Sequence, residues 1–298
     1  MKYPIDPSLR RFARLPVPLF RALFPMANFW LRHLSKQWDT KRVHVQCIQQ
    51  DSWTMHMLTP RGLDDQDLPC LYFLHGGGFV YAAAPHHRRM LQEYCLAASC
   101  KAVMMDYRLA PRHTHPAAMN DCIAGYRYLL DHAKDMHIDA SRIMLAGDSA
   151  GGFLALEVAH HAQQEKLPYP CGCMLLYPVV DPSMSSSSMQ RYLDTPLWNA
   201  RYNKKMWNWY RKGAPLESPL TYASTLPIPS IYLEVAEFDC LRDEGIALHH
   251  AFAPASPIQF QEILGAYHGY DVVARSPLTM KAKKQRIQFL KNCFHHHP

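Results

Sequence analysis

The chain has 298 residues, a length at which a single α/β domain is as common as two smaller domains. Hydrophobic residues make up 48% of it and charged residues 19%, which is typical of a soluble globular protein with a large buried core. The net charge of +7 is spread along the chain without a dense basic run, so no nucleic-acid partner is expected.

The nine cysteines are an odd number, and most of them stand among apolar residues. This usage predicts reduced cysteines in the core of a cytoplasmic protein, not a disulfide framework. Cys171 and Cys173 have no second pair at ligand spacing, and the sequence contains no H-E-x-x-H pattern. We therefore expect no metal site.

The N-terminal stretch from Phe12 to Trp30 is partly apolar but is interrupted by arginines and prolines. It contains neither an apolar run near the ~20 residues that span a bilayer nor the features of a signal peptide. Two interpretations of this basic, aromatic stretch remain open: a helical lid and a contact with a membrane surface. The C-terminal run His295–His297 is assigned no function.

Short strand patterns alternate with helical patterns after residue 42. The strand patterns are apolar runs bounded by turn residues, and the helical windows carry apolar residues near i, i+3 and i+4. The predicted strands are Val43–Ile48, Trp53–Leu58, Cys70–Leu74, Ala102–Met105, Arg142–Ala146, Met174–Tyr177, Ile231–Val235 and Ile258–Ile263. The predicted helices are Pro85–Ser99, Ala117–Asp135, Ala150–Glu165, Gly245–Phe252 and Ser276–Cys293.

This alternation predicts βαβ units, and thus a mostly parallel sheet with helices on both faces. No helix separates the first two strands, so we expect an antiparallel edge there. Residues 1–42 and about 181–225 do not follow the alternation, and the second segment is rich in aromatic residues. We predict an N-terminal cap segment over 1–42 and a catalytic domain over 43–298 with a cap insertion at about 181–225. Such a cap would cover the carboxyl edge of the sheet, where open α/β folds bind ligands.

The strongest chemical signal is Gly147-Asp148-Ser149-Ala150-Gly151, which matches the pattern G-x-S-x-G. In this pattern a strand turns sharply into a helix, so the serine hydroxyl stands clear of the backbone and the glycines allow close packing. The predicted strand before it and the predicted helix after it supply that context. A purely structural turn between strand and helix is the plainer alternative.

A second signal, His75-Gly76-Gly77-Gly78-Phe79, follows a predicted strand. Successive glycines expose backbone N–H groups, and such donors stabilise the oxyanion of acyl transfer by roughly 3–4 kcal/mol each in measured cases. We assign this role to the N–H groups of Gly77, Gly78 and Ala150. A phosphate-binding loop is the alternative, but the G-K-[ST] and G-x-G-x-x-G patterns are both absent.

With three further motifs, these signals resemble the bacterial hormone-sensitive-lipase-like esterases. The resemblance covers about Leu68 to Phe294 and rests on five motifs in the family's order: His75–Phe79, Asp106–Pro111, Gly147–Gly152, Asp239–Gly245 and His268-Gly269. It implies an α/β-hydrolase fold with a helical cap and hydrolysis of short- to medium-chain acyl esters. The sequence departs from the family at Cys240, where proline is usual, and at Tyr270, where phenylalanine is usual.

A nucleophilic serine needs a base and a carboxylate that orients the base, and α/β-hydrolases carry them in the order serine, acid, histidine. Among 18 histidines, His268 stands out because it follows the last predicted strand and precedes a glycine. Asp239 and Asp243 both follow the strand Ile231–Val235. We favour Asp239, because it comes first after the strand and the resemblance points to it, whereas Asp243 fits a first helical turn.

We therefore predict a serine carboxylesterase that acts on a small acyl ester through Ser149, His268, Asp239 and an acyl-enzyme intermediate, without a cofactor. Amide, formamide or lactone hydrolysis on the same triad remains open, as does a receptor that only binds a small apolar ligand. Four aromatic residues are candidates for an apolar acyl pocket: Phe79, Tyr177, Trp198 and Trp207.

The last predicted strand and helix, Ile258–Ile263 and Ser276–Cys293, complete the final edge of the predicted sheet. This edge is where we expect a homodimer contact.

Overall fold

The computed structural model describes residues 2–14, 17, 19–36, 39–253 and 255–295. Its centre is an eight-stranded sheet with the order β1-β2-β4-β3-β5-β6-β7-β8. The strands are β1 (Val43–Gln49), β2 (Thr54–Pro60), β3 (Leu68–Leu74), β4 (Lys101–Asp106), β5 (Ile138–Asp148), β6 (Gly172–Leu176), β7 (Ile231–Phe238) and β8 (Ile258–Tyr267).

The sheet is parallel from β4 to β8 and antiparallel at its first edge. β1 pairs with β2 and β2 pairs with β4 in antiparallel register, while the other neighbours pair in parallel. The predicted mostly parallel sheet with an antiparallel edge is confirmed. Every residue of β3 and β6 is buried, as expected for parallel strands that helices cover on both faces.

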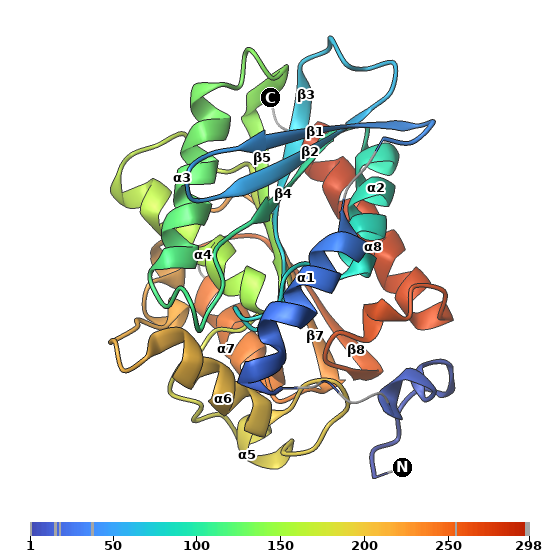
Figure 1. The fold of residues 1–298 in the computed structure, drawn as a ribbon, viewed down its shortest axis with the longest axis vertical. Helices are drawn as coiled ribbons and strands as arrows, with labels where there is room; N and C mark the ends of the chain where they lie inside the picture. Colours follow the sequence, from blue (N-terminus) through green and yellow to red (C-terminus); the bar gives the residue numbers. More distant parts are fainter. Residues whose placement is uncertain (1, 15–16, 18, 37–38, 254, 296–298) are drawn as a thin grey trace.

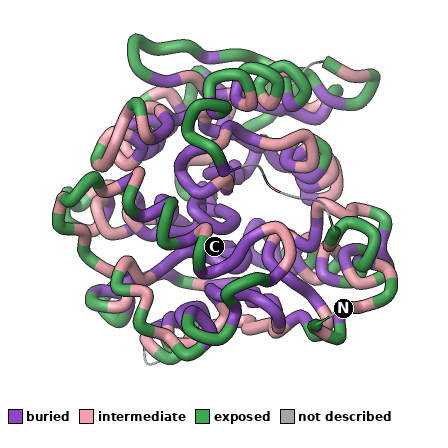
Figure 2. Tube along the Cα trace, turned by 60° about the horizontal axis from the view of Figure 1, so that its bottom comes forward, coloured by how far each residue is buried: buried purple, intermediate pink, exposed green. Residues whose placement is uncertain are grey.

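Helices cover both faces of the sheet. Figure 1 shows α3, α4 and α7 on one side of the sheet and α2 and α8 on the other, and Figure 2 shows the buried chain concentrated inside this layer arrangement. The helices are α1 (Phe24–Ser35), α2 (Pro85–Ala98), α3 (Ala117–Asp131), α4 (Ala150–Gln164), α5 (Ser187–Arg191), α6 (Ala200–Arg211), α7 (Arg242–Phe252) and α8 (Pro277–His295). Short 3₁₀ helices occupy Pro7–Leu9, Phe12–Arg14, Arg21–Leu23, Pro219–Thr221, Ala223–Thr225 and Tyr270–Val272.

Several element boundaries differ from their prediction, and hydrogen bonds explain two of the larger differences. β5 begins at Ile138, four residues earlier than its apolar run, because Ile138 pairs with Leu68 ahead of a register shift between β3 and β5. α3 ends at Asp131, since the following chain folds into turns in which the Met136 N–H donates to the His132 carbonyl. Both boundaries depend on hydrogen-bond partners that periodicity does not reveal.

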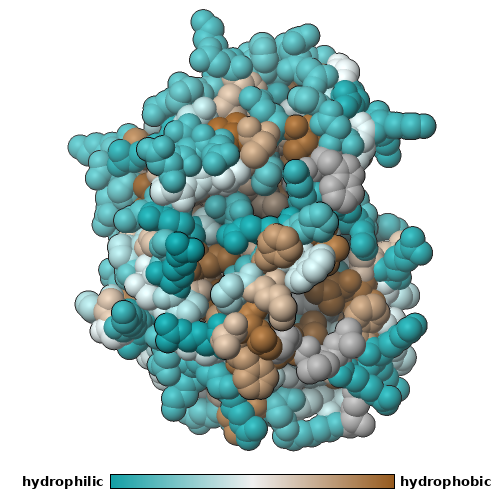
Figure 3. Space-filling view, in the orientation of Figure 1, coloured by the Kyte–Doolittle hydropathy of each residue, from teal (hydrophilic) through white to brown (hydrophobic). Residues whose placement is uncertain are grey.

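The segments outside the alternation gather at one end of the sheet. Figure 1 shows α5 and α6 at the end of the molecule toward which β7 and β8 run, and α1 crossing the front of the molecule from near that end to its middle. Figure 3 shows hydrophobic side chains gathered on the face that carries α1. Within the described ranges, no helix is both long enough and apolar enough to cross a bilayer. The last two residues of the C-terminal histidine run, 296 and 297, lie outside the described residues, as does residue 298.

A buried ionic cluster ties α8 to the sheet. The Arg286 guanidinium lies 2.6 Å from a carboxylate oxygen of Glu234 on β7 and 2.8 Å from one of Asp271. Tyr270 donates to Glu234 and Tyr177 donates to Asp271, at 2.8 Å and 2.6 Å. The two carboxylates are thus neutralised and hydrogen-bonded, as buried charges require.

Replacing Arg286 is expected to destabilise the fold strongly. Arg286→Leu leaves Glu234 and Asp271 buried without a counter-charge, so we expect the free energy of unfolding to fall by about 3–5 kcal/mol in denaturant titration. Lys283→Met on the same helix is the control, because its ion pair with Glu93 is partly exposed and is expected to contribute about 1 kcal/mol or less. Equal losses in the two variants would contradict the role given to the buried cluster.

Glu157 on α4 makes the stability depend on pH. Burial raises the pKa of this carboxyl to about 7 from 4.5, although Tyr222 donates a hydrogen bond to it. The unfolded chain releases this proton near pH 4.5, while the folded chain holds it to about pH 7. Stability contributed by the protonated group is therefore lost as the pH rises through this window. We expect Glu157→Gln, which stays neutral, to gain stability over the native chain with rising pH in urea titrations, and a constant difference would refute this.

Candidate active site

The turn from β5 into α4 holds Ser149 in a backbone conformation that few side chains adopt. Its φ is +52°, and α4 begins at the next residue. A Cβ on Gly147 would lie 2.3 Å from backbone atoms of Gly151, and one on Gly151 would lie 1.8 Å from the carbonyl oxygen of Leu74. Only glycine fits at both positions, so the G-x-S-x-G pattern stands at a strand-to-helix turn, where the sequence predicted it.

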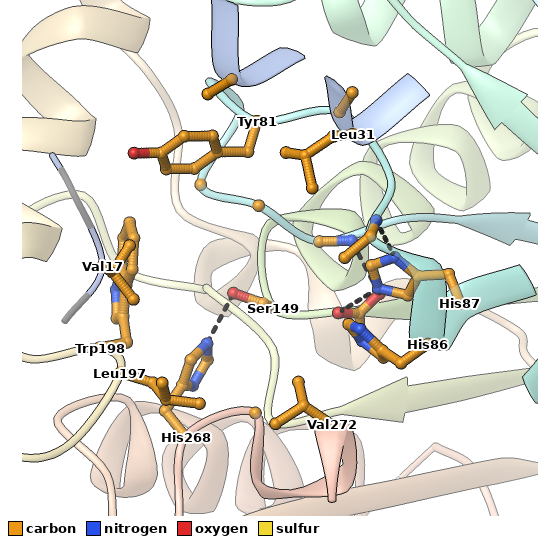
Figure 4. A pocket seen from close by; sticks show the side chains of 18 of the residues that line it. Val17, Leu31, Tyr81, His86, His87, Ser149, Leu197, Trp198, His268 and Val272 are labelled. Atoms are coloured by element: carbon orange, nitrogen blue, oxygen red, sulfur yellow. Dashed lines mark hydrogen bonds and ion pairs between the residues drawn. The ribbon is translucent and has the colours of Figure 1, made fainter. Parts of the chain in front are cut away.

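Ser149, His268 and Asp239 lie in one chain of hydrogen bonds. Ser149 Oγ is 2.9 Å from His268 Nε2 (Figure 4). His268 Nδ1 is 2.7 Å from Asp239 Oδ2. All three side chains are buried, and Asp239 is 0% exposed. Because the carboxylate accepts from Nδ1, the free lone pair of the neutral ring is on Nε2 and faces the hydroxyl. This tautomer suits proton transfer from the serine.

Asp243, the other carboxylate considered, has different partners. It accepts a hydrogen bond from the Ser188 N–H at 2.8 Å and pairs with Arg242 at 2.8 Å. Asp239 instead lies directly after β7 and accepts a second hydrogen bond from the Leu241 N–H at 3.0 Å. The geometry therefore brings Asp239, and not Asp243, to the histidine.

The glycine loop after β3 runs beside Ser149. Gly77 and Gly78 have φ values of +116° and +59°, and a Cβ on either would lie 2.6 Å from the Tyr81 carbonyl oxygen or the Trp198 ring. Among the described residues, the N–H groups of Gly77 and Gly78 have no hydrogen-bond acceptor, whereas the Gly77 carbonyl accepts from the Val80 and Tyr81 N–H groups. Together with the N-terminus of α4 at Ala150, they leave donors beside the serine for a developing negative charge.

Asp148, the residue before the serine, anchors this loop. Its Oδ1 accepts from the Gly76 N–H at 2.7 Å, and its Oδ2 is 3.1 Å from His87 Nε2. Burial acts to raise the pKa of Asp148, but interactions with His87 and the Gly76 amide hold that pKa below its usual range. A buried carboxylate therefore fixes the start of the glycine loop.

His86, His87 and Asp148 bring three ligand-type atoms within 4.8 Å of one another. The Ala84 N–H donates to His87 Nδ1 at 2.9 Å, so the proton of the neutral His87 ring is on Nε2 and points to Asp148. His87 therefore has no free lone pair for a metal ion. Burial lowers the pKa of His86 to about 4, so this ring is neutral near pH 7. The cluster serves better as a brace than as a metal site.

A cavity of about 490 Å³ opens over the serine. Ser149, His268 and the glycine loop line one side, and apolar side chains of α1 line another (Figure 4). Sequence analysis missed these α1 residues, although their spacing at i, i+3 and i+4 along an amphipathic helix was a readable signal. They are Ala27, Trp30, Leu31 and Leu34.

Two of the four aromatic pocket candidates do line the cavity. Trp198 lies beside the glycine loop, and Tyr177 packs edge-on against the His268 ring with 5.0 Å between centroids. Phe79 and Trp207 lie outside it, contrary to expectation. Phe79 has a positive φ of +59°. Its ring stacks on the Tyr210 ring with 3.9 Å between centroids, and both rings are part of the buried core.

Comparisons with known proteins agree with this geometry. A family model described as alpha/beta hydrolase fold matches residues 71–272. Esterase LipI of Mycobacterium tuberculosis is 31% identical over 214 residues, which cover 70% of this chain and 67% of that protein. Ethyl acetate hydrolase of Pseudomonas putida is 31% identical over 207 residues, which cover 67% and 65%.

Solved structures agree along nearly the whole chain. The structure titled Bacterial Heroin Esterase has a TM-score of 0.88 and 25% identity, and the match covers 99% of this chain and 100% of that chain. A thermostable esterase from Pseudomonas putida has a TM-score of 0.85 and 26% identity, with 98% of both chains covered.

Asp148→Asn tests the brace of the glycine loop. An asparagine that still accepts from the Gly76 N–H turns its own N–H₂ toward the His87 Nε2–H, so two donors oppose each other. We expect kcat for a soluble p-nitrophenyl ester to fall by about tenfold or more while KM changes little. Asp139→Asn, at the partly exposed start of the same strand, is the matched control, and a similar fall in kcat there would contradict the role given to Asp148.

Proposed function

We propose that this chain, which belongs to the alpha/beta hydrolase family and within it to the hormone-sensitive-lipase-like bacterial esterases, is a serine carboxylesterase for short- to medium-chain acyl esters. Its named relatives are esterases, carboxylesterases and lipases, and the chain is accordingly a carboxylic ester hydrolase. The observation that carries the finer proposal is the continuous hydrogen-bond chain of Ser149, His268 and Asp239 at the floor of an apolar cavity.

The proposed reaction has two steps on one set of groups. Ser149 Oγ attacks the ester carbonyl carbon while its proton passes to His268 Nε2, and Asp239 stabilises the imidazolium. The bond to the alcohol then breaks, and the alcohol leaves with the proton from His268. Water, activated by the same imidazole, hydrolyses the acyl-serine and restores the enzyme. No step in this mechanism uses a cofactor.

The negative charge of each tetrahedral intermediate needs donors beside Ser149. We propose that the N–H groups of Gly77, Gly78 and Ala150 supply them. Each such donor contributes roughly 3–4 kcal/mol in measured cases, because it is already aligned when the charge develops. The positive φ of both glycines and the Asp148 anchor support this proposal, since they fix the loop before the substrate arrives.

The size of the cavity limits the acyl group. A volume of about 490 Å³ lies within the range of small-molecule sites, and its walls are mostly apolar. We propose that residues 1–42 and about 181–225 act as a cap on the hydrolase domain, because α1, Leu197 and Trp198 all line this space. A long acyl chain would have to leave the cavity through its mouth.

We also propose a cytoplasmic location. All nine cysteines are free and eight of them are buried, a usage typical of proteins in reducing compartments. A homodimer through the β8 and α8 edge stays a prediction, which the mass in solution would test.

Substitution of Ser149 tests the proposed function. We expect the native chain to hydrolyse p-nitrophenyl acetate, butyrate and octanoate with saturable initial rates, and the palmitate ester more slowly. Ser149→Ala is expected to lower kcat by at least about 10³-fold, because the nucleophile is lost.

Ser185→Ala, which changes an exposed serine in the 181–225 segment, is the control and is expected to keep full activity. Equal rates for the native chain and Ser149→Ala would show that another group is the nucleophile. No activity in either protein would favour a narrow-substrate hydrolase or a binding protein.

A further inference from the structure

The exposed apolar side chains of this protein are concentrated near its N-terminus. Ten large hydrophobic residues are exposed in the described part of the chain, and seven of them fall between residues 12 and 34. Scattered exposed apolar residues are normal, but a gathered group marks an interaction site. The seven are Phe12, Phe20, Leu23, Met26, Phe29, Trp30 and Leu34.

The fold fixes which face of α1 points outward. The Asn28 side chain donates to the Val80 carbonyl at 2.8 Å and accepts from the Ala82 N–H at 2.9 Å. Ser35, the last residue of α1, donates to the Ala83 carbonyl at 2.6 Å. These buried hydrogen bonds seat the inner face of α1 on the segment after the glycine loop. Met26 and Phe29, which are 57% and 65% exposed, therefore have to lie on the outer face.

The charge around this face is mainly positive. Residues 7–38 contain six Lys and Arg and no Asp or Glu. Arg21, Arg32 and Lys36 are exposed on or next to α1, and the acidic partner there is Asp106, 3.1 Å from Arg32. A groove along another side of α1 is lined by two further arginines, Arg108 and Arg112. Of these, Arg108 forms an ion pair with Asp121. Apolar side chains between cationic ones suit the surface of an anionic bilayer.

The same helix forms a wall of the cavity over the serine. Leu31 and Leu34 line that cavity, and Trp30 both lines it and remains 54% exposed. In Figure 3 the hydrophobic side chains gather in the region of α1, and Figure 4 shows Leu31 pointing into the space above Ser149. A surface that covers the outer face of α1 would therefore lie against the mouth of the cavity. Tryptophan is also a preferred residue at membrane interfaces.

We propose that the outer face of α1, centred on Met26 and Phe29, docks the protein on an anionic phospholipid surface and turns the cavity mouth toward the lipid. Docking itself does not depend on catalysis. Its consequence for substrate, that acyl esters dissolved in the lipid phase enter over α1, rests on the proposed esterase function.

The test measures binding of the full chain to vesicles by co-sedimentation. The Ser149→Ala protein is used, so that the result does not depend on esterase activity. We expect binding to vesicles that contain phosphatidylglycerol, weaker binding to pure phosphatidylcholine vesicles, and loss of binding as salt rises.

The double variant Met26→Ser and Phe29→Ser is expected to weaken that binding by at least about tenfold, because it removes the apolar contact. In the background with Ser149 intact, the same variant should hydrolyse soluble p-nitrophenyl butyrate normally, since neither side chain lines the cavity. Met280→Ser is the matched control, because Met280 on α8 is 45% exposed and lies outside this face.

Equal vesicle binding by the parent and the double variant would overturn the proposal, as would a parent that binds neither vesicle. A parent that is dimeric in solution, with a double variant that is monomeric, would assign the face to a second copy and would also overturn it. Vesicle binding together with no esterase activity in the chain that keeps Ser149 would count against the proposed function and leave the docking surface standing.

Discussion

The site depends on one close approach of backbone, at the point where α4 begins. The chain at Gly151 packs against the Leu74 carbonyl so tightly that a methyl group there would lie 1.8 Å from the oxygen. This contact places the end of β3 beside the start of α4. Because the glycine loop follows β3 directly, the same contact sets Gly77 and Gly78 next to Ser149. A larger residue at position 151 would separate the serine from its proposed oxyanion donors.

Two buried polar clusters hold the two sides of the site. On one side, Asp148 and His87 fix the first amide of the glycine loop. On the other side, Arg286 forms an ion pair with Asp271, three residues after His268. Tyr177 donates a hydrogen bond to Asp271 and packs edge-on against the His268 ring. Hydrogen bonds to buried charges are strong and directional, so both loops have little freedom. The cavity between them is apolar, and its shape is set by polar groups that lie behind its walls.

Much of this could be predicted from sequence, because local signals specify it. Alternating periods placed the strands, and motif order singled out His268 and Asp239 without any contact information. Phe79 shows where local reasoning fails: its positive φ turns the ring into the core, and no pattern encodes that rotation. Arg286 and the lining residues of α1 meet the site only through tertiary packing over long sequence separations. From the sequence, Arg286 could be predicted only as a residue of a helix, and the α1 residues only as one face of an amphipathic helix.

The N-terminal helix α1 has an inner face that is firmly hydrogen-bonded to the core and an outer face that exposes large apolar side chains. Its inner face carries Asn28 and Ser35, whose hydrogen bonds are buried and satisfied, so α1 is held in place rather than merely resting on the core. On its outer face Phe29 and Met26 are exposed to water. Exposed apolar surface has an unfavourable solvation free energy. A surface that is costly in water and rigidly presented beside a cavity mouth gains favourable free energy only when something apolar covers it. The cationic border of that surface selects an anionic apolar phase over a neutral one.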